Sequence, residues 1–113
     1  MEIFDKPFSK NVLKEMQGNF FEDMVKGVVD IDKNILAVDA ELHSDLEHFL
    51  LEQGSLQENL WGINLYPEIV GDDFLEFDSL INIRPHQGNR SRNVEKPEIR
   101  GKIIELVKRL VED

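Results

Sequence analysis

The sequence predicts a single α+β domain, residues 1–113, in which a four-stranded, mainly antiparallel sheet has its helices packed on one face. Three observations support this fold class. Segments with apolar residues at helical spacing alternate with valine- and isoleucine-rich segments in the order α-β-β-α-β-β-α. The chain has 113 residues, a length that suits one domain with its own core. No repeat, low-complexity tract or linker divides it.

The first half of the chain predicts a helix followed by a hairpin. Ser9 can cap a helix from about Lys10 to Phe21, whose apolar residues recur every three to four positions. A valine-rich strand from Met24 to Ile31 turns at residues 32–34 and returns as a strand from Ile35 to Leu42. The return strand alternates apolar and polar residues, which predicts one buried and one wet face.

A capping box predicts the second helix. Ser44 precedes Glu47 by three residues, so that each side chain can bond the backbone amide of the other residue, and the helix should begin at about Asp45. Gly54 supplies the left-handed residue that ends this helix.

Two strands and a helix complete the predicted fold. The third strand runs from Leu60 to Tyr66, and the fourth runs from Phe74 to Arg84. Because Leu80 interrupts the alternation of the fourth strand, we expect a bulge near Ser79. The last helix begins at Pro97 and keeps apolar residues at helical spacing to the end of the chain.

Composition and charge exclude several classes of function. The chain has no cysteine, which excludes disulfides, thiolate metal sites and a cysteine nucleophile. Its net charge of −10 argues against nucleic acid as a partner, because phosphates attract a basic surface. The N-terminus lacks the features of a secretion signal and no segment is long enough to span a membrane. We therefore expect a cytoplasmic protein without a membrane partner.

The positive charge is concentrated near the C-terminus. Residues 1–83 contain eighteen acidic residues, five lysines and no arginine, whereas all five arginines lie in residues 84–113. The simplest explanation is that these arginines neutralise acidic neighbours in the fold. The alternative is a local anion site on a body that otherwise repels anions.

Residues 84–93 form the best candidate site. Three arginines, three side-chain amides, an imidazole and a hydroxyl occur within these ten residues. Arginine offers two parallel hydrogen bonds to a pair of oxygens, so this loop can bind a phosphate or carboxylate. The candidate ligand-binding residues are Arg84, Gln87, Asn89, Arg90 and Arg92. Alternatively, the arginines pair with the chain's own carboxylates, such as Asp78 or Glu76, and the asparagines shape turns.

The second polar cluster spans residues 41–48. On a strand, Glu41 and His43 would point to the same side, where a carboxylate and an imidazole can share a proton or a metal ion. The cluster lacks a metal-binding histidine pattern, so we predict no metal and no cofactor, and its alternative is a solvated strand face. If the second and fourth strands are neighbours, this cluster would join Asn82 and Arg84 in a small active site.

Several separated motifs occur in a fixed order along the chain. They are Glu-Leu-His at 41–43, Leu-Trp-Gly-Ile-Asn-Leu-Tyr-Pro at 60–67, and Ile-Asn-Ile-Arg-Pro at 81–85 followed by Gln-Gly-Asn-Arg-Ser-Arg at 87–92. Together they resemble a family of small uncharacterised prokaryotic proteins, a domain of unknown function, over most of the chain from about Val25 to the final helix. The resemblance implies a small cytoplasmic bacterial or archaeal protein and transfers no catalytic residue. That family often has two glycines where this chain has Asp39-Ala40.

These observations lead to two main hypotheses. The first is a non-enzymatic binding module whose arginine-rich loop engages an anionic small molecule or a partner protein, or forms part of a homodimer contact. The second is a small hydrolase or phosphoryl-handling enzyme, with His43 or His86 as the acid–base group and Glu41 to orient it. The arginines of residues 84–92 would then hold the developing negative charge. Sequence-independent RNA binding through the same residues is a third hypothesis, which the acidic body disfavours.

Overall fold

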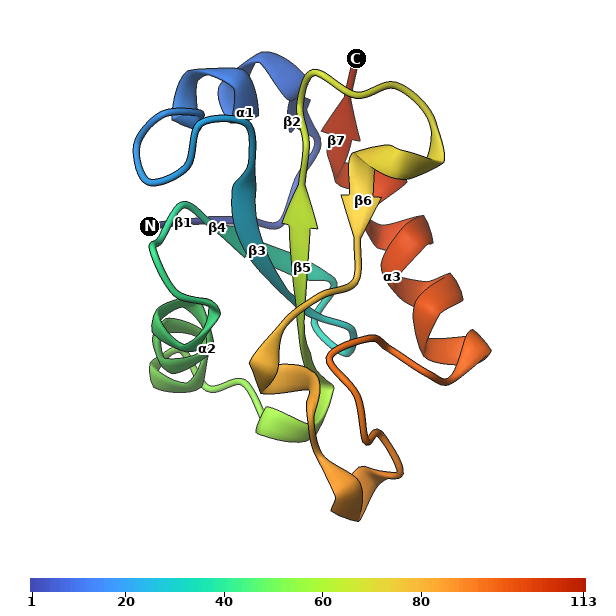
Figure 1. Ribbon diagram of the computed structural model, residues 1–113. Coiled ribbons are helices and arrows are strands. Elements are labelled where there is room, and N and C mark those ends of the chain that lie inside the picture. The colour runs from blue at the N-terminus through green and yellow to red at the C-terminus, as the bar shows by residue number, and fades with distance from the viewer.

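The computed structural model describes residues 1–113 and confirms an α+β domain with a mainly antiparallel sheet (Figure 1). The strands of this sheet are β1 (Glu2–Phe4), β3 (Val25–Asp30), β4 (Ile35–Val38), β5 (Leu60–Leu65) and β6 (Leu75–Glu76). The helices are α1 (Lys10–Met16), α2 (His43–Glu52) and α3 (Pro97–Leu110). The strand order is β1-β4-β3-β5-β6, with every neighbouring pair antiparallel. A separate parallel pair joins β2 (Phe8–Ser9) to β7 (Val111–Glu112).

The helices lie on both faces of the sheet, so the predicted packing on one face is wrong. α1 and α3 pack into the larger core, which contains Val29 and Trp61. α2 packs Leu46 and Leu50 against Val28 on the opposite face. Figure 1 shows α2 and α3 on opposite sides of β5. A strand covered on both faces need not alternate apolar and polar residues, and all six residues of β5 are buried.

The sheet has five strands rather than the predicted four. β1 is the additional strand, and its three residues are too few to show a period of two. The predicted fourth strand is reduced to β6, because residues 80–82 and 85–87 form single 3₁₀ turns. The Ser79 hydroxyl accepts a hydrogen bond from the Ile81 amide at 3.3 Å, and such local bonds compete with strand pairing. A turn, not a bulge, therefore explains the exposure of Leu80.

The start of α2 also differs from the prediction. The helix begins at His43 with Leu42 as its N-cap and has no side-chain capping bond, so the predicted capping box of Ser44 and Glu47 is wrong. Gly54 follows the helix with a φ of 96° and ends it as predicted. The earlier start moves His43 from the predicted strand into the first turn of a helix.

The hairpin of β3 and β4 is confirmed, although its second strand ends at Val38 instead of Leu42. Asp39 has a φ of 77°, in the left-handed region that favours glycine, and this turn takes the chain out of the sheet. The carboxylate of Asp39 accepts hydrogen bonds from Asn19 at 3.1 and 3.2 Å.

The other helix predictions hold at their N-termini. Ser9 caps α1 and accepts from the Asn11 amide at 3.1 Å, although α1 ends at Met16 rather than Phe21. Pro97 is the first residue of α3, as predicted. None of the helices is both long and apolar enough to cross a membrane.

Candidate functional site

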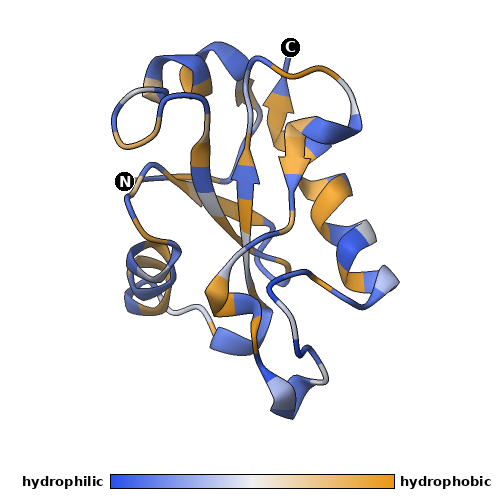
Figure 2. Cartoon of the chain, in the orientation of Figure 1, coloured by the Kyte–Doolittle hydropathy of each residue, from blue (hydrophilic) through white to orange (hydrophobic).

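Residues 84–93, called the arginine loop below, are closed by hydrogen bonds within the loop. The loop lies at the lower end of Figure 1 and is mostly hydrophilic in Figure 2. Arg84 donates its amide to the Asn89 carbonyl at 2.7 Å, and Asn89 donates back at 3.2 Å. The buried Asn89 side chain contacts three backbone carbonyls at 2.7–3.1 Å, those of Asn82, Ser91 and Asn93. This asparagine is the hub of the loop.

Arg84 is buried, and its guanidinium faces the interior. It donates to the carbonyls of Gln57 and Leu60 at the start of β5. Its Cζ lies 4.2 Å from the centre of the Trp61 ring. Burial lowers the pKa of Arg84, and the nearby Glu47 carboxylate partly offsets this effect. Arg84 therefore ties the arginine loop to the sheet.

Asn82 attaches the same loop to the middle of β5. Its side chain accepts from the Gly62 amide at 2.8 Å and donates to the Gly62 carbonyl at 3.0 Å, as a neighbouring strand would. A third bond reaches the Arg92 carbonyl at 3.0 Å. A side chain at position 62 would collide with the turn at Ser79, because a Cβ there would lie 2.5 Å from the Cβ and Oγ of Ser79.

The remaining predicted ligand-binding side chains differ in how far they are engaged. Gln87 donates to the Glu58 carbonyl at 3.1 Å. Arg92 donates to Asp78 at 2.5 Å, although the two side chains remain 55% and 44% exposed. The guanidinium of Arg90 is exposed and makes no hydrogen bond or ion pair. His86 is also exposed and unpaired.

The outer surface of the arginine loop carries an excess of positive charge. Lys96 lies close to the loop, since its Nζ is 3.9 Å from the position of a Cβ on Gly88. Glu95 is the acidic residue that follows the loop, and it accepts from the Ser91 hydroxyl and the Arg90 amide, each at 2.8 Å. These two bonds lower the pKa of Glu95, and the bond from Ser91 has the larger effect. The carboxylate of Glu95 therefore stays charged.

His43, from the second predicted cluster, is buried at the start of α2. Its Nε2 donates to the Ile63 carbonyl on β5 at 2.8 Å. Burial lowers the pKa of His43, so the imidazole is neutral at pH 7 and its Nδ1 carries the lone pair. Glu41 is exposed and makes no contact with this ring.

Asn64 joins His43 to Tyr66 and Glu76, and these four residues are called the polar row below. Nδ2 of Asn64 donates to Glu76 at 2.9 Å and to the Asp78 carbonyl at 3.1 Å. Burial lowers the pKa of His43 and Asn64 partly offsets this effect, whereas Oδ1 of Asn64 has no hydrogen-bond partner. Tyr66 donates to Glu76 at 2.9 Å, and burial followed by this bond raises the pKa of Tyr66 to about 12.

The predicted juxtaposition of the two clusters is wrong, and the connection between them is indirect, through residues outside both. β3 and β5 separate β4 from β6, so the second and fourth predicted strands are not neighbours. α2 instead carries His43 across the face of the sheet to β5. Asp78 provides the link, because its carbonyl accepts from Asn64 in the polar row and its carboxylate accepts from Arg92 in the arginine loop.

The sequence of the chain matches one known protein family. The family described as "Protein of unknown function (DUF5674)" matches residues 2–110. The chain belongs to this family. The match covers the whole of the arginine loop and the polar row. No curated protein and no solved structure matches the chain.

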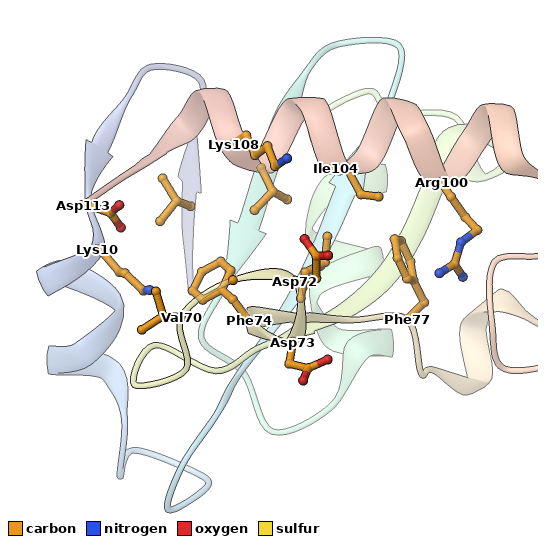
Figure 3. Close-up of a pocket in the computed structure, with 14 residues that line it drawn as sticks. Lys10, Val70, Asp72, Asp73, Phe74, Phe77, Arg100, Ile104, Lys108 and Asp113 are labelled. Carbon is orange, nitrogen blue, oxygen red and sulfur yellow. The ribbon is translucent and has the colours of Figure 1, made fainter.

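A cavity of this DUF5674 chain lies away from both polar clusters and was not predicted. It is a groove of about 790 Å³ between α3 and residues 70–77. Figure 3 shows Phe74 and Phe77 on one wall and Ile104 of α3 on the other. Lys10 lies 4.4 Å from the centre of the Phe74 ring and Arg100 lies 4.2 Å from that of Phe77. This cavity between α3 and residues 70–77 is called the groove below.

Sequence reasoning missed three features of these sites, and two left a signal. Asn64 stands in the middle of the most apolar strand, where a polar side chain needs a partner. Ile69 and Val70 are apolar residues in a connection that also contains three acidic residues, and Val70 is 88% exposed at the groove. The link through Asp78 depends on the turn at Ser79 and left no signal in the apolar alternation. Among all residues, no three histidine or carboxylate side chains are grouped as a metal ion requires.

Proposed function

We propose that this DUF5674 chain is a binding module in which the arginine loop holds an anionic group of its partner. The observation that carries this proposal is the division of the loop into an engaged interior and an unpaired exterior. Arg84 and Asn89 are buried and bonded to backbone carbonyls, whereas the Arg90 guanidinium is exposed and unpaired. A loop braced in this way loses little conformational freedom when a ligand binds.

Arg92 supplies a second guanidinium at the same surface. Its present partner, Asp78, is about half exposed, and an exposed ion pair contributes less than about 1 kcal/mol. An incoming phosphate or carboxylate can therefore replace Asp78 at small cost. Charge-assisted bonds from Arg90 and Arg92 would hold two or more oxygens of one anionic group. The partner is an anionic small molecule or an acidic segment of a protein, a second copy of the chain included.

A thermal-shift screen tests this function, because a ligand that binds the native state raises its melting temperature. The screen uses inorganic phosphate, nucleotides, small carboxylates and divalent metals against the wild type and the Arg90→Ala/Arg92→Ala variant. We expect an anion to raise the melting temperature of the wild type and not that of the Arg90→Ala/Arg92→Ala variant. The matched control is Lys102→Ala/Arg109→Ala, which removes two exposed cations from α3 and should retain the shift. Equal shifts in all three proteins, or no shift with any anion, contradict the proposal.

One observation favours a small hydrolase as a second candidate function. The neutral, buried imidazole of His43 lies close to Asn64, which donates to the Asp78 carbonyl, and the half-exposed guanidinium of Arg92 bonds the Asp78 carboxylate. In such an enzyme Nδ1 of His43 would accept a proton and Arg92 would stabilise negative charge. Glu41 does not contact the ring and would have no orienting role. The test is hydrolysis of p-nitrophenyl phosphate and p-nitrophenyl acetate by the wild type, with His43→Asn as the inactive variant and His86→Asn as the control.

A further inference from the structure

β6 is an edge strand whose second side faces the groove. It is the last strand in the order of the sheet and pairs only with β5. α3 forms the other wall of the groove, and the residues in Figure 3 line the space between the two elements. The Phe77 amide donates to no acceptor within the chain. An unpaired strand edge is a template to which another extended segment can add.

The groove offers apolar surface to every second residue of an added strand. Leu75 and Phe77 pack toward the core that contains α3, and Ile104 and Val107 line the groove from the helix. Side chains of a strand alternate between the two faces of a sheet. Alternate residues of an added strand would therefore pack against these apolar side chains. The intervening residues would lie on the other face, beside the exposed Glu76.

The carboxylates without ion-pair partners around the edge strand favour a basic occupant. Asp72 and Asp73 lie along the wall formed by the sheet edge, and neither has an ion-pair partner. Lys10 and Arg100 lie over aromatic rings and donate hydrogen bonds to oxygen atoms of the chain. Lys108 is the cation in the groove lining that has no such partner. The net charge of −10 also attracts a basic partner over a longer distance.

We infer that the groove binds an extended segment of a partner protein in which apolar residues alternate with lysine or arginine, and that this segment adds as a strand to β6. The apolar residues enter the groove and the basic residues lie beside Glu76. A backbone carbonyl of the segment accepts a hydrogen bond from the unpaired Phe77 amide. This site is separate from the arginine loop, where an anionic group would bind.

Three fluorescein-labelled octapeptides test the inference by anisotropy. The first alternates valine and lysine, the second alternates valine and glutamate, and the third has the composition of the first with its valines and lysines in two blocks. We expect the first peptide to bind at least about tenfold more tightly than the others, because only it places apolar and basic groups on the correct faces. Equal affinities for the three peptides would overturn the inference.

Two protein variants locate the bound peptide. Ile104→Gln places a polar group in the groove and should weaken binding of the first peptide by about tenfold, since it removes apolar contact. Lys102→Gln is the matched control on the same helix outside the groove, and its affinity should change by less than about twofold. The Arg90→Ala/Arg92→Ala variant should bind as the wild type does, which separates this inference from the proposed function. Unaltered binding by a folded Ile104→Gln protein would overturn it.

The Phe77 amide provides a measurement that needs no substitution. In a ¹⁵N–¹H spectrum of the wild type, the first peptide should move the Phe77 resonance and protect its amide from exchange, because a new backbone hydrogen bond forms there. Binding that leaves this resonance unmoved would show contact without strand addition and would overturn the inference.

Discussion

The arginine loop and the polar row contain similar residue types, but they use them differently. In the loop, the Asn89 side chain satisfies backbone carbonyls that no strand or helix partners. In the polar row, the Asn64 side chain bonds the side chain of Glu76 and a single backbone carbonyl, that of Asp78, and its Oδ1 has no hydrogen-bond partner. A dense set of donors in a loop is therefore first a means of building that loop, because irregular backbone must still satisfy its polar groups. The donors available for a ligand are those exposed on the surface of the loop, above all Arg90.

The largest expected effect comes from removing the hub of the loop. Asn89→Ala deletes the four side-chain hydrogen bonds of a buried residue, three to carbonyls and one from the Glu95 amide. We expect a loss of about 3 kcal/mol in the free energy of unfolding, since buried backbone groups lose their partners. Urea denaturation measures this loss. Arg90→Ala is the control within the same loop and should change stability by less than about 0.5 kcal/mol.

Similar costs for these two variants would contradict the division of the loop into interior and exterior. A loss of about 3 kcal/mol in Arg90→Ala would mean that its guanidinium is engaged in solution. A loss below about 1 kcal/mol in Asn89→Ala would mean that the loop does not depend on its hub.

The attachment of the loop to the sheet gives the next largest effect. Gly62→Ala would bring a methyl group within 2.5 Å of Ser79, which forces the turn away from β5. We expect a loss of about 2 kcal/mol, typical of overpacking in a close contact. Thermal unfolding measures it, and adding Ser79→Gly should recover part of the loss, because the two residues are coupled. If the double variant is as unstable as the sum of the singles predicts, the close approach is not the cause.

The sequence predicts the elements whose stability is local and misses those that depend on side chains bonding backbone. Local patterns predict the helix that starts at Pro97 and the hairpin of β3 and β4. These patterns are the first helical residue, the turn residues and the apolar spacing. The segment from Phe74 to Arg84 alternates like a strand, yet Ser79 and Asn82 bond nearby backbone and convert most of it to turns. Such bonds depend on which strand lies next to the segment, and apolar alternation carries no information about them.

The candidate site follows the same rule. Arg92 and His43 were both selected from the sequence, but their connection through Asp78 and Asn64 requires the actual paths of β6 and α2. Asn64 lies within the predicted third strand, and the structure buries it close to His43, which the sequence did not predict. Residue types can thus be predicted as chemically capable, while their convergence depends on tertiary structure.

The polar row should make the stability of the chain depend on pH. Burial lowers the pKa of His43 in the folded chain below its unfolded value, so the unfolded state binds the proton more readily. The contribution of His43 to the free energy of unfolding is present above pH 6.5 and decreases as the pH falls below that value. We expect the wild type to lose about 1 kcal/mol more than His43→Asn between pH 7.5 and 5.5, since a full proton of linkage gives about 1.4 kcal/mol per pH unit. Urea denaturation at the two pH values measures the difference.

The control for this pH dependence is His86→Asn, which alters an exposed histidine in the arginine loop. It should retain the full loss of the wild type. Equal losses in the wild type and in His43→Asn would show that the imidazole of His43 titrates alike in the folded and unfolded chain.

The smallest expected effect concerns Asp39, whose turn directs the chain from β4 toward α2 and so places His43. A φ of 77° costs a residue other than glycine about 1 kcal/mol, but here the Asp39 carboxylate also bonds Asn19. Asp39→Gly relieves the strain and loses the exposed bonds, and we expect stability within about 0.5 kcal/mol of the wild type. Asp39→Ala keeps the strain and loses the bonds, so it should be less stable by about 1 kcal/mol. If urea denaturation places the alanine variant level with the glycine variant, backbone conformation is not what limits this position, and the carboxylate alone explains the aspartate.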